Sequence, residues 1–348
     1  MKKNLALILS VLLLLAMLAG CGAKQPNASP SDIDLPSNEP VTSPEEESLG
    51  TIRLATLKGP TSMGLIKLLD DDAAGTLSYD VENTIYGAAD EITALLVGGE
   101  LDMAAIPCNL ASTLYNKTSS KLQIAAVNTL GVLYVLELGD SVSSIEDLKG
   151  KTVYSTGKGT TPEYTLNAIL SANGIDPDTD LTLDFKSEAT EIAAMLTGDT
   201  AVTGTVAVLP QPYATTVLMN NPDARIALSL NEEWTKAGLD GKPVTGVLVV
   251  NSDFAAANPE LVSSFLSDYN DSVTWVNENN EAAAELIAAA EIVPKAAVAV
   301  KALPYCSIVF ESGADMKADV SAYLEVLFAQ ESKSVGGALP DDNFYYGA

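Results

Sequence analysis

Two short loops of this sequence carry side chains suited to binding a small molecule. Residues 56–61 and 156–161 both follow the pattern T-x-K-G-x-T. Lysine supplies a positive charge, threonine supplies a hydroxyl group, and glycine lets a ligand approach the backbone closely. In both copies the pattern runs into an apolar helical spacing, and a helix N-terminus favours an anionic or acceptor-rich group. Each loop therefore suggests a site for an acceptor-rich ligand, although capped turns of this kind also occur without ligands.

The candidate ligand-binding residues lie in these two loops, after two later strands that each end in proline, and at one aromatic position. They are Lys58, Gly59, Pro60, Thr61, Ser62, Tyr86, Pro107, Cys108, Asn109, Thr156, Gly157, Lys158, Gly159, Thr160, Thr161, Pro210, Gln211 and Tyr213. Lys58 and Lys158 are equivalent by position, and each is either a ligand contact or a solvated surface charge. Asn109 either bonds the ligand or caps the next helix, and Glu163 is expected to be a first-turn carboxylate that the helix dipole favours.

Composition excludes several other kinds of site. The chain has 46 acidic and 19 basic residues, a net charge of −27, which disfavours binding to nucleic acid. It has no histidine, which removes the usual general base, the Ser-His-Asp and Cys-His nucleophiles, and histidine-containing metal sites. A phosphate-binding loop would need a glycine where Ile145 stands before Gly150-Lys151-Thr152. No catalytic residue, metal or cofactor is predicted.

A second repeated motif shows how the two loops are positioned. Residues 91–98 and 191–198 both read E-I-x-A-x-L-x-G, at the same offset of 100 residues as the loops. Two motifs that share one offset indicate two copies of one structural plan. In each copy, β-type runs alternate with helical spacing, so we predict α/β sheets with helices on their faces. Ligands of such sheets bind beyond the carboxyl ends of the strands, where these loops would lie.

The N-terminal segment is expected to direct export. Two lysines precede the apolar run of residues 5–20, which is short for a membrane span and typical of a signal peptide. The run ends in Leu18-Ala19-Gly20-Cys21, which resembles the bacterial lipobox, so residues 1–20 are interpreted as a lipoprotein signal peptide and Cys21 as the lipidated residue. Residues 21–50, rich in proline, serine and glutamate, are predicted to be a disordered tether. Cys108 and Cys306 could pair outside the cell or remain two buried thiols.

The string from Ile145 to Val153, together with Gly157–Glu163, resembles the second-lobe opening of extracytoplasmic solute-binding lipoproteins of ABC importers. The nearest branch includes nitrate, sulfonate, taurine and thiamine-pyrimidine-precursor binders. Residues 98–107 and 210–214 are similar to two further segments of that branch, in which an acidic residue often stands at the position of Gln211. The resemblance covers residues 51–348.

The resemblance implies a two-lobed α/β fold of the type II periplasmic-binding-protein class, with two hinge crossovers. On this chain, lobe 1 would comprise 51–128 plus 246–348, and lobe 2 would comprise 129–245. The crossovers would lie near 127–132 and 243–247, where Gly131 and Gly246 could absorb hinge rotation.

The implied function is capture of a small organic solute between the lobes and delivery to a membrane permease, without catalysis. The protein would be a monomer held outside the cytoplasm on the membrane by its lipid. The alternatives are a dehydratase-like enzyme on the same fold, or a signalling lipoprotein. The ligand is either acceptor-rich, such as a sulfonate or carboxylate, or a heteroaromatic ring stacked on Tyr86, Tyr134 or Tyr213.

Overall fold

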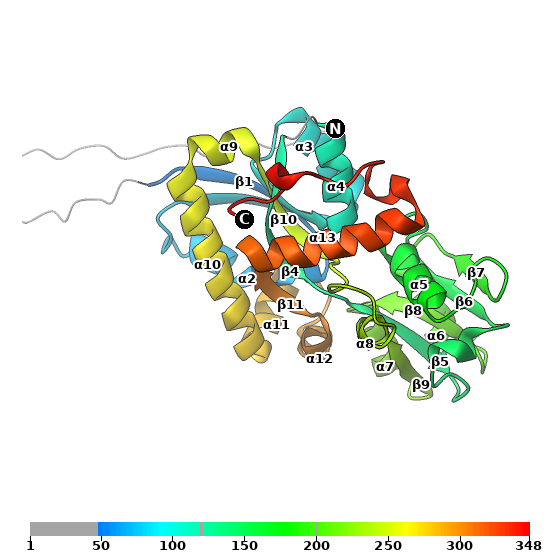
Figure 1. Ribbon diagram of the computed structural model, residues 1–348. Helices are drawn as coiled ribbons and strands as arrows, with labels where there is room; N and C mark the ends of the chain where they lie inside the picture. The colour runs from blue at the N-terminus through cyan, green and yellow to red at the C-terminus, as the bar shows by residue number, and fades with distance from the viewer. Residues whose placement is uncertain (1–47, 119–120, 200) are drawn as a thin grey trace, which may run out of the picture. The chain divides into compact units, whose positions relative to one another are not determined.

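The computed structural model describes residues 48–118, 121–199 and 201–348. In this part of the chain the strands form two separate sheets, of six and five strands, and helices cover both (Figure 1). We call the six-stranded sheet with its helices lobe 1, and the five-stranded sheet with its helices lobe 2. The expected signal peptide, residues 1–20, and nearly all of the expected tether lie outside the described residues.

The sheet of lobe 1 combines parallel and antiparallel strands. It contains β1 (Thr51–Leu57), β2 (Asp80–Tyr86), β3 (Met103–Pro107), β4 (Leu122–Thr129), β10 (Gly246–Asn251) and β11 (Ile308–Glu311), in the order β11-β4-β10-β3-β1-β2. Strands β2 and β3 flank β1 in parallel, whereas β10 runs antiparallel to β3 and β4. The carboxyl ends of β1, β2 and β3 therefore share one edge of the sheet.

The sheet of lobe 2 repeats this plan. It contains β5 (Leu133–Leu138), β6 (Thr152–Ser155), β7 (Thr182–Phe185), β8 (Val206–Pro210) and β9 (Ala224–Ser229), in the order β7-β6-β8-β5-β9. Strands β7 and β8 flank β6 in parallel, and β5 runs antiparallel to β8 and β9. The order matches β2-β1-β3-β10-β4 of lobe 1. Strands β1 to β4 have their counterparts in β6 to β9 about 100 residues later, whereas β5 precedes the other strands of its sheet and its counterpart β10 follows β1 to β4.

The helices follow the strands as in an α/β protein. Lobe 1 carries α1 (Pro60–Met63), α2 (Ile66–Ala73), α3 (Ala89–Gly98), α4 (Cys108–Lys117), α9 (Ser252–Ala257), α10 (Pro259–Glu278), α11 (Asn280–Ala289), α12 (Ala296–Ala302) and α13 (Gly313–Gln330). Lobe 2 carries α5 (Thr161–Ala172), α6 (Ala189–Thr197), α7 (Tyr213–Asn220) and α8 (Leu230–Lys236). Short 3₁₀ turns occupy Ile145–Leu148, Leu303–Tyr305, Ser332–Val335 and Asp342–Phe344. The two copies of the E-I-x-A-x-L-x-G motif lie on α3 and α6.

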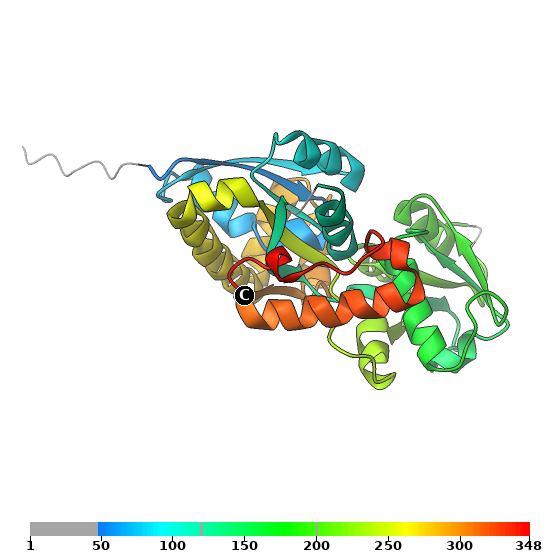
Figure 2. The same cartoon turned by 45° about the horizontal axis from the view of Figure 1, so that its top comes forward.

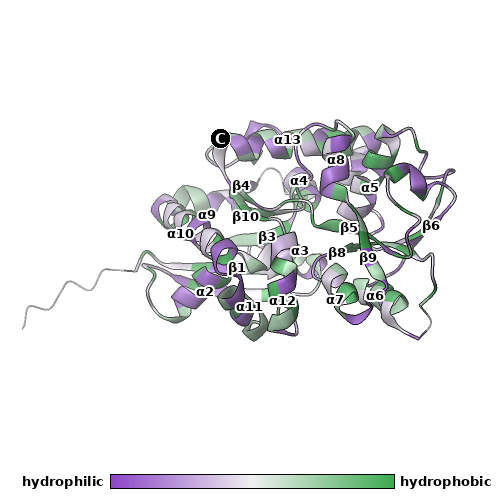
Figure 3. Cartoon of the chain, turned by 90° about the horizontal axis from the view of Figure 1, so that it is seen from below, coloured by the Kyte–Doolittle hydropathy of each residue, from purple (hydrophilic) through white to green (hydrophobic). Residues whose placement is uncertain are grey.

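The central strands are apolar on both faces because helices cover both faces. Val247–Val250 in β10 and Val206–Leu209 in β8 are buried throughout. Such continuous apolar runs are typical of strands enclosed between two layers of helices. Figure 3 shows these hydrophobic strands inside and hydrophilic residues on the outer faces of helices such as α2 and α13. The predicted α/β class with helices on the sheet faces is therefore confirmed.

The chain crosses between the lobes twice, once from β4 to β5 and once from α8 to β10. Gly131 lies in the first crossover and Gly246 begins the strand after the second. A Cβ atom added at Gly246 would lie 2.5 Å from Thr61 Cγ2, and one at Gly131 would lie 2.9 Å from Asn231 Cβ. Neither glycine has a positive φ. Both positions need glycine for close packing in this conformation.

Helix α13 joins the two lobes on one side of the crossovers. It contacts β4 of lobe 1 and α5 of lobe 2, and Figures 1 and 2 show it extending from one to the other. Tyr323 on α13 is fully buried against Trp234 of α8, with ring centroids 5.5 Å apart. The Tyr323 hydroxyl is 3.0 Å from that of Thr165 on α5. A single buried apolar cluster therefore runs through both lobes.

Candidate functional site

A cavity of about 650 Å³ lies between the lobes. Its walls come from the loop after β1, the ends of β3 and β8, helices α6 and α7, and a loop after α11. The lining residues are Leu57, Lys58, Gly59, Pro60, Thr61, Pro107, Thr129, Val132, Thr190, Ala193, Ala194, Thr197, Pro210, Gln211, Pro212, Tyr213, Thr216, Thr245, Ile292, Val293 and Pro294. The volume falls within the range of small-molecule sites. We call this space the main cavity.

A second cavity, of about 550 Å³, adjoins the main cavity at Pro107 and Thr245, which line both. The predicted site residues that line this second cavity are Pro107, Asn109, Gly159, Thr160 and Thr161. Asp90 of lobe 1 and Lys333 also line it. The Thr161 hydroxyl donates across the lobes to Asn109 Oδ1 over 3.0 Å. The predicted residues therefore divide between two neighbouring spaces.

The loop after β1 holds the cation of the main cavity. The Thr61 hydroxyl donates to the Leu57 carbonyl over 2.7 Å, and the Ser62 hydroxyl donates to the Gly59 carbonyl over 2.9 Å. These bonds tighten the turn and bury Ser62 behind it. The side chain of Lys58 is exposed and forms no ion pair with any described residue. The lining contains no aspartate or glutamate, so Lys58 is its one charged group.

The equivalent loop of lobe 2 satisfies its own hydrogen-bonding groups. The Gly159 N–H donates to the carboxylate of Glu163, in the first turn of α5. The Thr160 N–H and hydroxyl both donate to the Gly157 carbonyl. Lys158 Nζ lies over the ring of Phe185, 5.8 Å from its centroid. Thr156, Gly157 and Lys158 line neither cavity. The repeated T-x-K-G-x-T pattern therefore has different surroundings in the two lobes.

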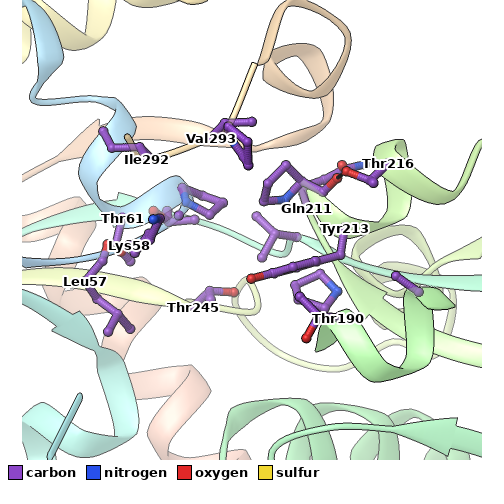
Figure 4. Close-up of a pocket in the computed structure, with 18 of the residues that line it drawn as sticks. Leu57, Lys58, Thr61, Thr190, Gln211, Tyr213, Thr216, Thr245, Ile292 and Val293 are labelled. Atoms are coloured by element: carbon purple, nitrogen blue, oxygen red, sulfur yellow. Dashed lines mark hydrogen bonds between the residues drawn. The ribbon is translucent and has the colours of Figure 1, made fainter. Parts of the chain in front are cut away.

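The loop after β8 supplies the polar wall of lobe 2. Gln211 is 1% exposed, and its Oε1 accepts from the Thr215 hydroxyl over 2.8 Å. Tyr213 extends across the cavity towards Thr245 (Figure 4). Burial, and then the negative charge of Glu188, raise the pKa of the Tyr213 phenol. Tyr213 is therefore a neutral hydroxyl at physiological pH.

Other sequence-predicted residues lie outside both cavities. Tyr86 ends β2 and is half-buried against the core. The Tyr134 hydroxyl donates to the Tyr305 carbonyl over 2.9 Å, and the two rings meet edge to face. Cys108 and Cys306 are free, fully buried thiols, and burial raises the pKa of both.

Among the described residues no helix has the length and apolar character needed to cross a membrane.

Several lining residues were missed from the sequence. Thr190, Ala193, Ala194 and Thr197 lie on one side of α6, and their counterparts on α3 suggested nothing beyond a helix. Thr245 lies on the crossover that returns to lobe 1. Ile292, Val293 and Pro294 come from a C-terminal loop, and no motif marked them as neighbours of residue 58. The shared helix motif at residues 191–198 was the one available signal for part of this wall.

Comparisons with known proteins agree with this architecture. A model of the NMT1-like family matches residues 79–291, which is more than half of the chain. An ABC transporter protein from Parabacteroides distasonis has a similar structure at 24% identity and a TM-score of 0.71, over 85% of this chain and 98% of that one. The periplasmic aliphatic sulphonate binding protein of Escherichia coli is similar at 17% identity and a TM-score of 0.65, over 82% and 94%.

A third solved structure, the periplasmic nitrate-binding protein of Synechocystis, is similar at 17% identity and a TM-score of 0.50, over 68% of this chain and 65% of that one. No curated protein matches the sequence. The structural likenesses confirm the predicted two-lobed periplasmic-binding-protein fold. The family match also shows that this chain belongs to the NMT1-like family.

Proposed function

We propose that this protein is the solute-binding component of an ABC importer, which holds a small organic solute between its lobes and delivers it to a membrane permease. The main cavity is the observation that carries the proposal, because both lobes and a crossover contribute to its walls. A ligand that contacts both lobes binds the closed arrangement more tightly than the open one and shifts the population towards it. Binding and release of this kind need no covalent chemistry. A single copy of the chain is sufficient for them.

The lining favours an organic anion as the solute. Lys58 is its one charged group, whereas most of the remaining residues are apolar or carry a hydroxyl. Two of the similar structures are described as binding aliphatic sulphonates and nitrate, both of which are anions. An apolar lining is better suited to an anion with a hydrocarbon part than to an inorganic ion.

Replacement of Lys58 with methionine is expected to weaken binding of an anionic solute roughly tenfold, because the main cavity loses its one charge. The measurement is thermal unfolding against a panel of small anions, followed by titration calorimetry with each stabilising compound. At 100 times the dissociation constant, ligand should stabilise the wild-type protein by about 2.7 kcal/mol. Turnover of a compound, without stabilisation by any, would favour an enzyme instead.

The matched control is Lys158→Met, which changes the equivalent loop of lobe 2 outside both cavities. This variant should bind like the wild-type protein. Equal weakening by both substitutions would mean that the chain's overall charge, and not the position of Lys58, controls affinity.

We also propose that the protein is lipidated at Cys21 and held on the outer face of the membrane. The supporting observation is the apolar run of residues 5–20 followed by Leu-Ala-Gly-Cys. Two or more acyl chains would anchor it stably. In a bacterial host fed labelled palmitate, the wild-type chain should incorporate label and sediment with membranes, and Cys21→Ser should do neither. The proposal would be contradicted if the Cys21→Ser variant incorporated no label and still sedimented with membranes.

A further inference from the structure

The second cavity is lined by both lobes, as the main cavity is. Lobe 1 contributes residues of α3, α4 and the 3₁₀ turn Ser332–Val335, and lobe 2 contributes the start of α5 with the residues just before it. The hydrogen bond from Thr161 to Asn109 joins these two walls, and both side chains are buried. A space of about 550 Å³ in this position is large enough for a small molecule.

Most uncharged polar groups of this lining already bond to the protein. Five of its six hydroxyl groups donate within the protein, four of them to backbone carbonyls. The Asn109 amide accepts from Thr161 and donates to the Ser334 carbonyl. The five hydroxyl groups belong to Thr93, Thr113, Thr160, Thr161 and Ser334. The uncharged part of the wall therefore has few free donors for a ligand.

Two opposite charges in the same lining are uncommitted. Asp90 on α3 and Lys333 in the 3₁₀ turn are its charged residues, and neither side chain forms an ion pair or a hydrogen bond with any described residue. A carboxylate binds an ammonium group, and a lysine binds a carboxylate, sulfonate or phosphate. A ligand with one charge would be attracted by one of these side chains and repelled by the other, whereas a zwitterion is attracted by both.

We propose that the second cavity is a binding site for a small zwitterion, separate from the solute site in the main cavity. The ammonium group of the ligand pairs with Asp90, and its anionic group pairs with Lys333. The site goes beyond the proposed function, because capture of an anion beside Lys58 does not require it. Since both lobes line the second cavity, a zwitterion bound there also favours the closed arrangement.

The test uses ω-amino acids whose two charges are progressively further apart: glycine, β-alanine, 4-aminobutyrate and 6-aminohexanoate. Titration calorimetry compares each with the acid that lacks the amino group and with the amine that lacks the carboxyl group. At least one zwitterion should bind the wild-type protein with a dissociation constant at least about tenfold below those of its two singly charged analogues. The proposal is overturned if no member of the series binds, or if a singly charged analogue always binds equally well.

Asp90→Asn and Lys333→Met each remove one of the two charges and should weaken binding of the zwitterion about tenfold. Both side chains are exposed, so the unfolding midpoint without ligand should stay near that of the wild-type protein. Glu91→Gln is the matched control, because Glu91 is the next residue of α3, is also exposed and lines neither cavity. Unchanged binding in Asp90→Asn or Lys333→Met, or equal weakening in Glu91→Gln, would overturn the proposal.

Lys58→Met shows which cavity holds the zwitterion. This variant removes the one charged group of the main cavity and should leave the dissociation constant of the zwitterion unchanged. Loss of zwitterion binding in Lys58→Met would overturn the proposal, because it would place the ligand in the main cavity.

The outcomes also separate this inference from the proposed function. If an anion of the earlier panel stabilises the protein and no zwitterion binds, the proposed function stands and the second site is wrong. If a zwitterion binds as described and no anion does, the second site stands and the assignment of the main cavity as the solute site is wrong.

Discussion

Replacing Trp234 with alanine is expected to lower the free energy of unfolding by about 3–5 kcal/mol, the range for deleting a large buried aromatic side chain. Trp234 is fully buried on α8, and its ring packs on Tyr323 of α13. Its indole N–H donates to the Asp240 carbonyl over 3.3 Å, at the start of the crossover that returns to lobe 1. The substitution therefore removes packing where helix α13 meets lobe 2.

The chain provides its own control, because its two tryptophans are Trp234 and Trp275. Trp275 lies half-buried on α10 of lobe 1, with Lys67 Nζ 5.7 Å from its ring centroid. Trp275→Ala should lower the free energy of unfolding by at most about half as much, because the half-buried Trp275 side chain buries less apolar surface than that of Trp234. Urea unfolding followed by circular dichroism compares the two variants. A larger loss for Trp275→Ala would show that the contact between α13 and α8 contributes little.

The second large effect concerns a buried carboxylate in lobe 2. Glu137 on β5 is fully buried, and Arg225 on β9 donates to it over 2.6 Å. Arg225 also donates to the carbonyls of Gly139 and Val142. Arg225→Met should lower the free energy of unfolding by about 2–3 kcal/mol, because it leaves a buried charge without its counter-ion. The value lies below the range for fully buried pairs, since the Arg225 side chain is 36% exposed.

The effect should depend on pH in a defined direction. Burial by itself would raise the pKa of Glu137, but hydrogen bonds from Ser141, Val142 and Arg225 outweigh it and hold the pKa below its ordinary value. A carboxyl whose folded pKa is lowered stabilises the fold above its unfolded pKa, and that stability disappears as the pH falls through the folded pKa. The difference between wild type and Arg225→Met should therefore be largest near neutral pH and shrink in acid.

The control for this substitution removes a cation from a partly exposed pair. Lys67 pairs with Asp70 and Asp71 on α2, and Lys67→Met should cost less than about 1 kcal/mol. Urea titrations of both variants at pH 7 and pH 3.5 give the four values needed. A loss for Arg225→Met that stays constant between these pH values would contradict the role assigned to the Glu137 charge.

The duplicated plan of the fold could be predicted from the sequence because its signals are local. The T-x-K-G-x-T and E-I-x-A-x-L-x-G motifs recur at one offset, and each covers fewer than ten residues. Turn glycines, helix caps and apolar spacing act between near neighbours, so they survive in a linear pattern. The predicted family branch, read from such short strings, is confirmed by the family match and by the similar structures.

The division of the predicted site into two spaces was decided by tertiary structure. Lys58 and Lys158 share a motif, yet Lys58 lines the main cavity and Lys158 lies over Phe185, which a neighbouring strand supplies. The Gly159 N–H, which the motif suggested as a donor for a ligand, donates instead to the carboxylate of Glu163. These contacts depend on which strands lie side by side, and a loop motif carries no information about its neighbours.

The sequence by itself determined the α/β class, the repeated topology and the strand ends at which a ligand would be bound. The walls of the cavity depended on long-range packing. Ile292 and Val293 join Lys58 only after the chain has crossed between the lobes twice, and Gly246 is needed because Thr61 approaches it closely. Local patterns specify helices, strands and turns, whereas a binding surface forms where distant segments pack, and the free energy of that packing depends on the whole fold.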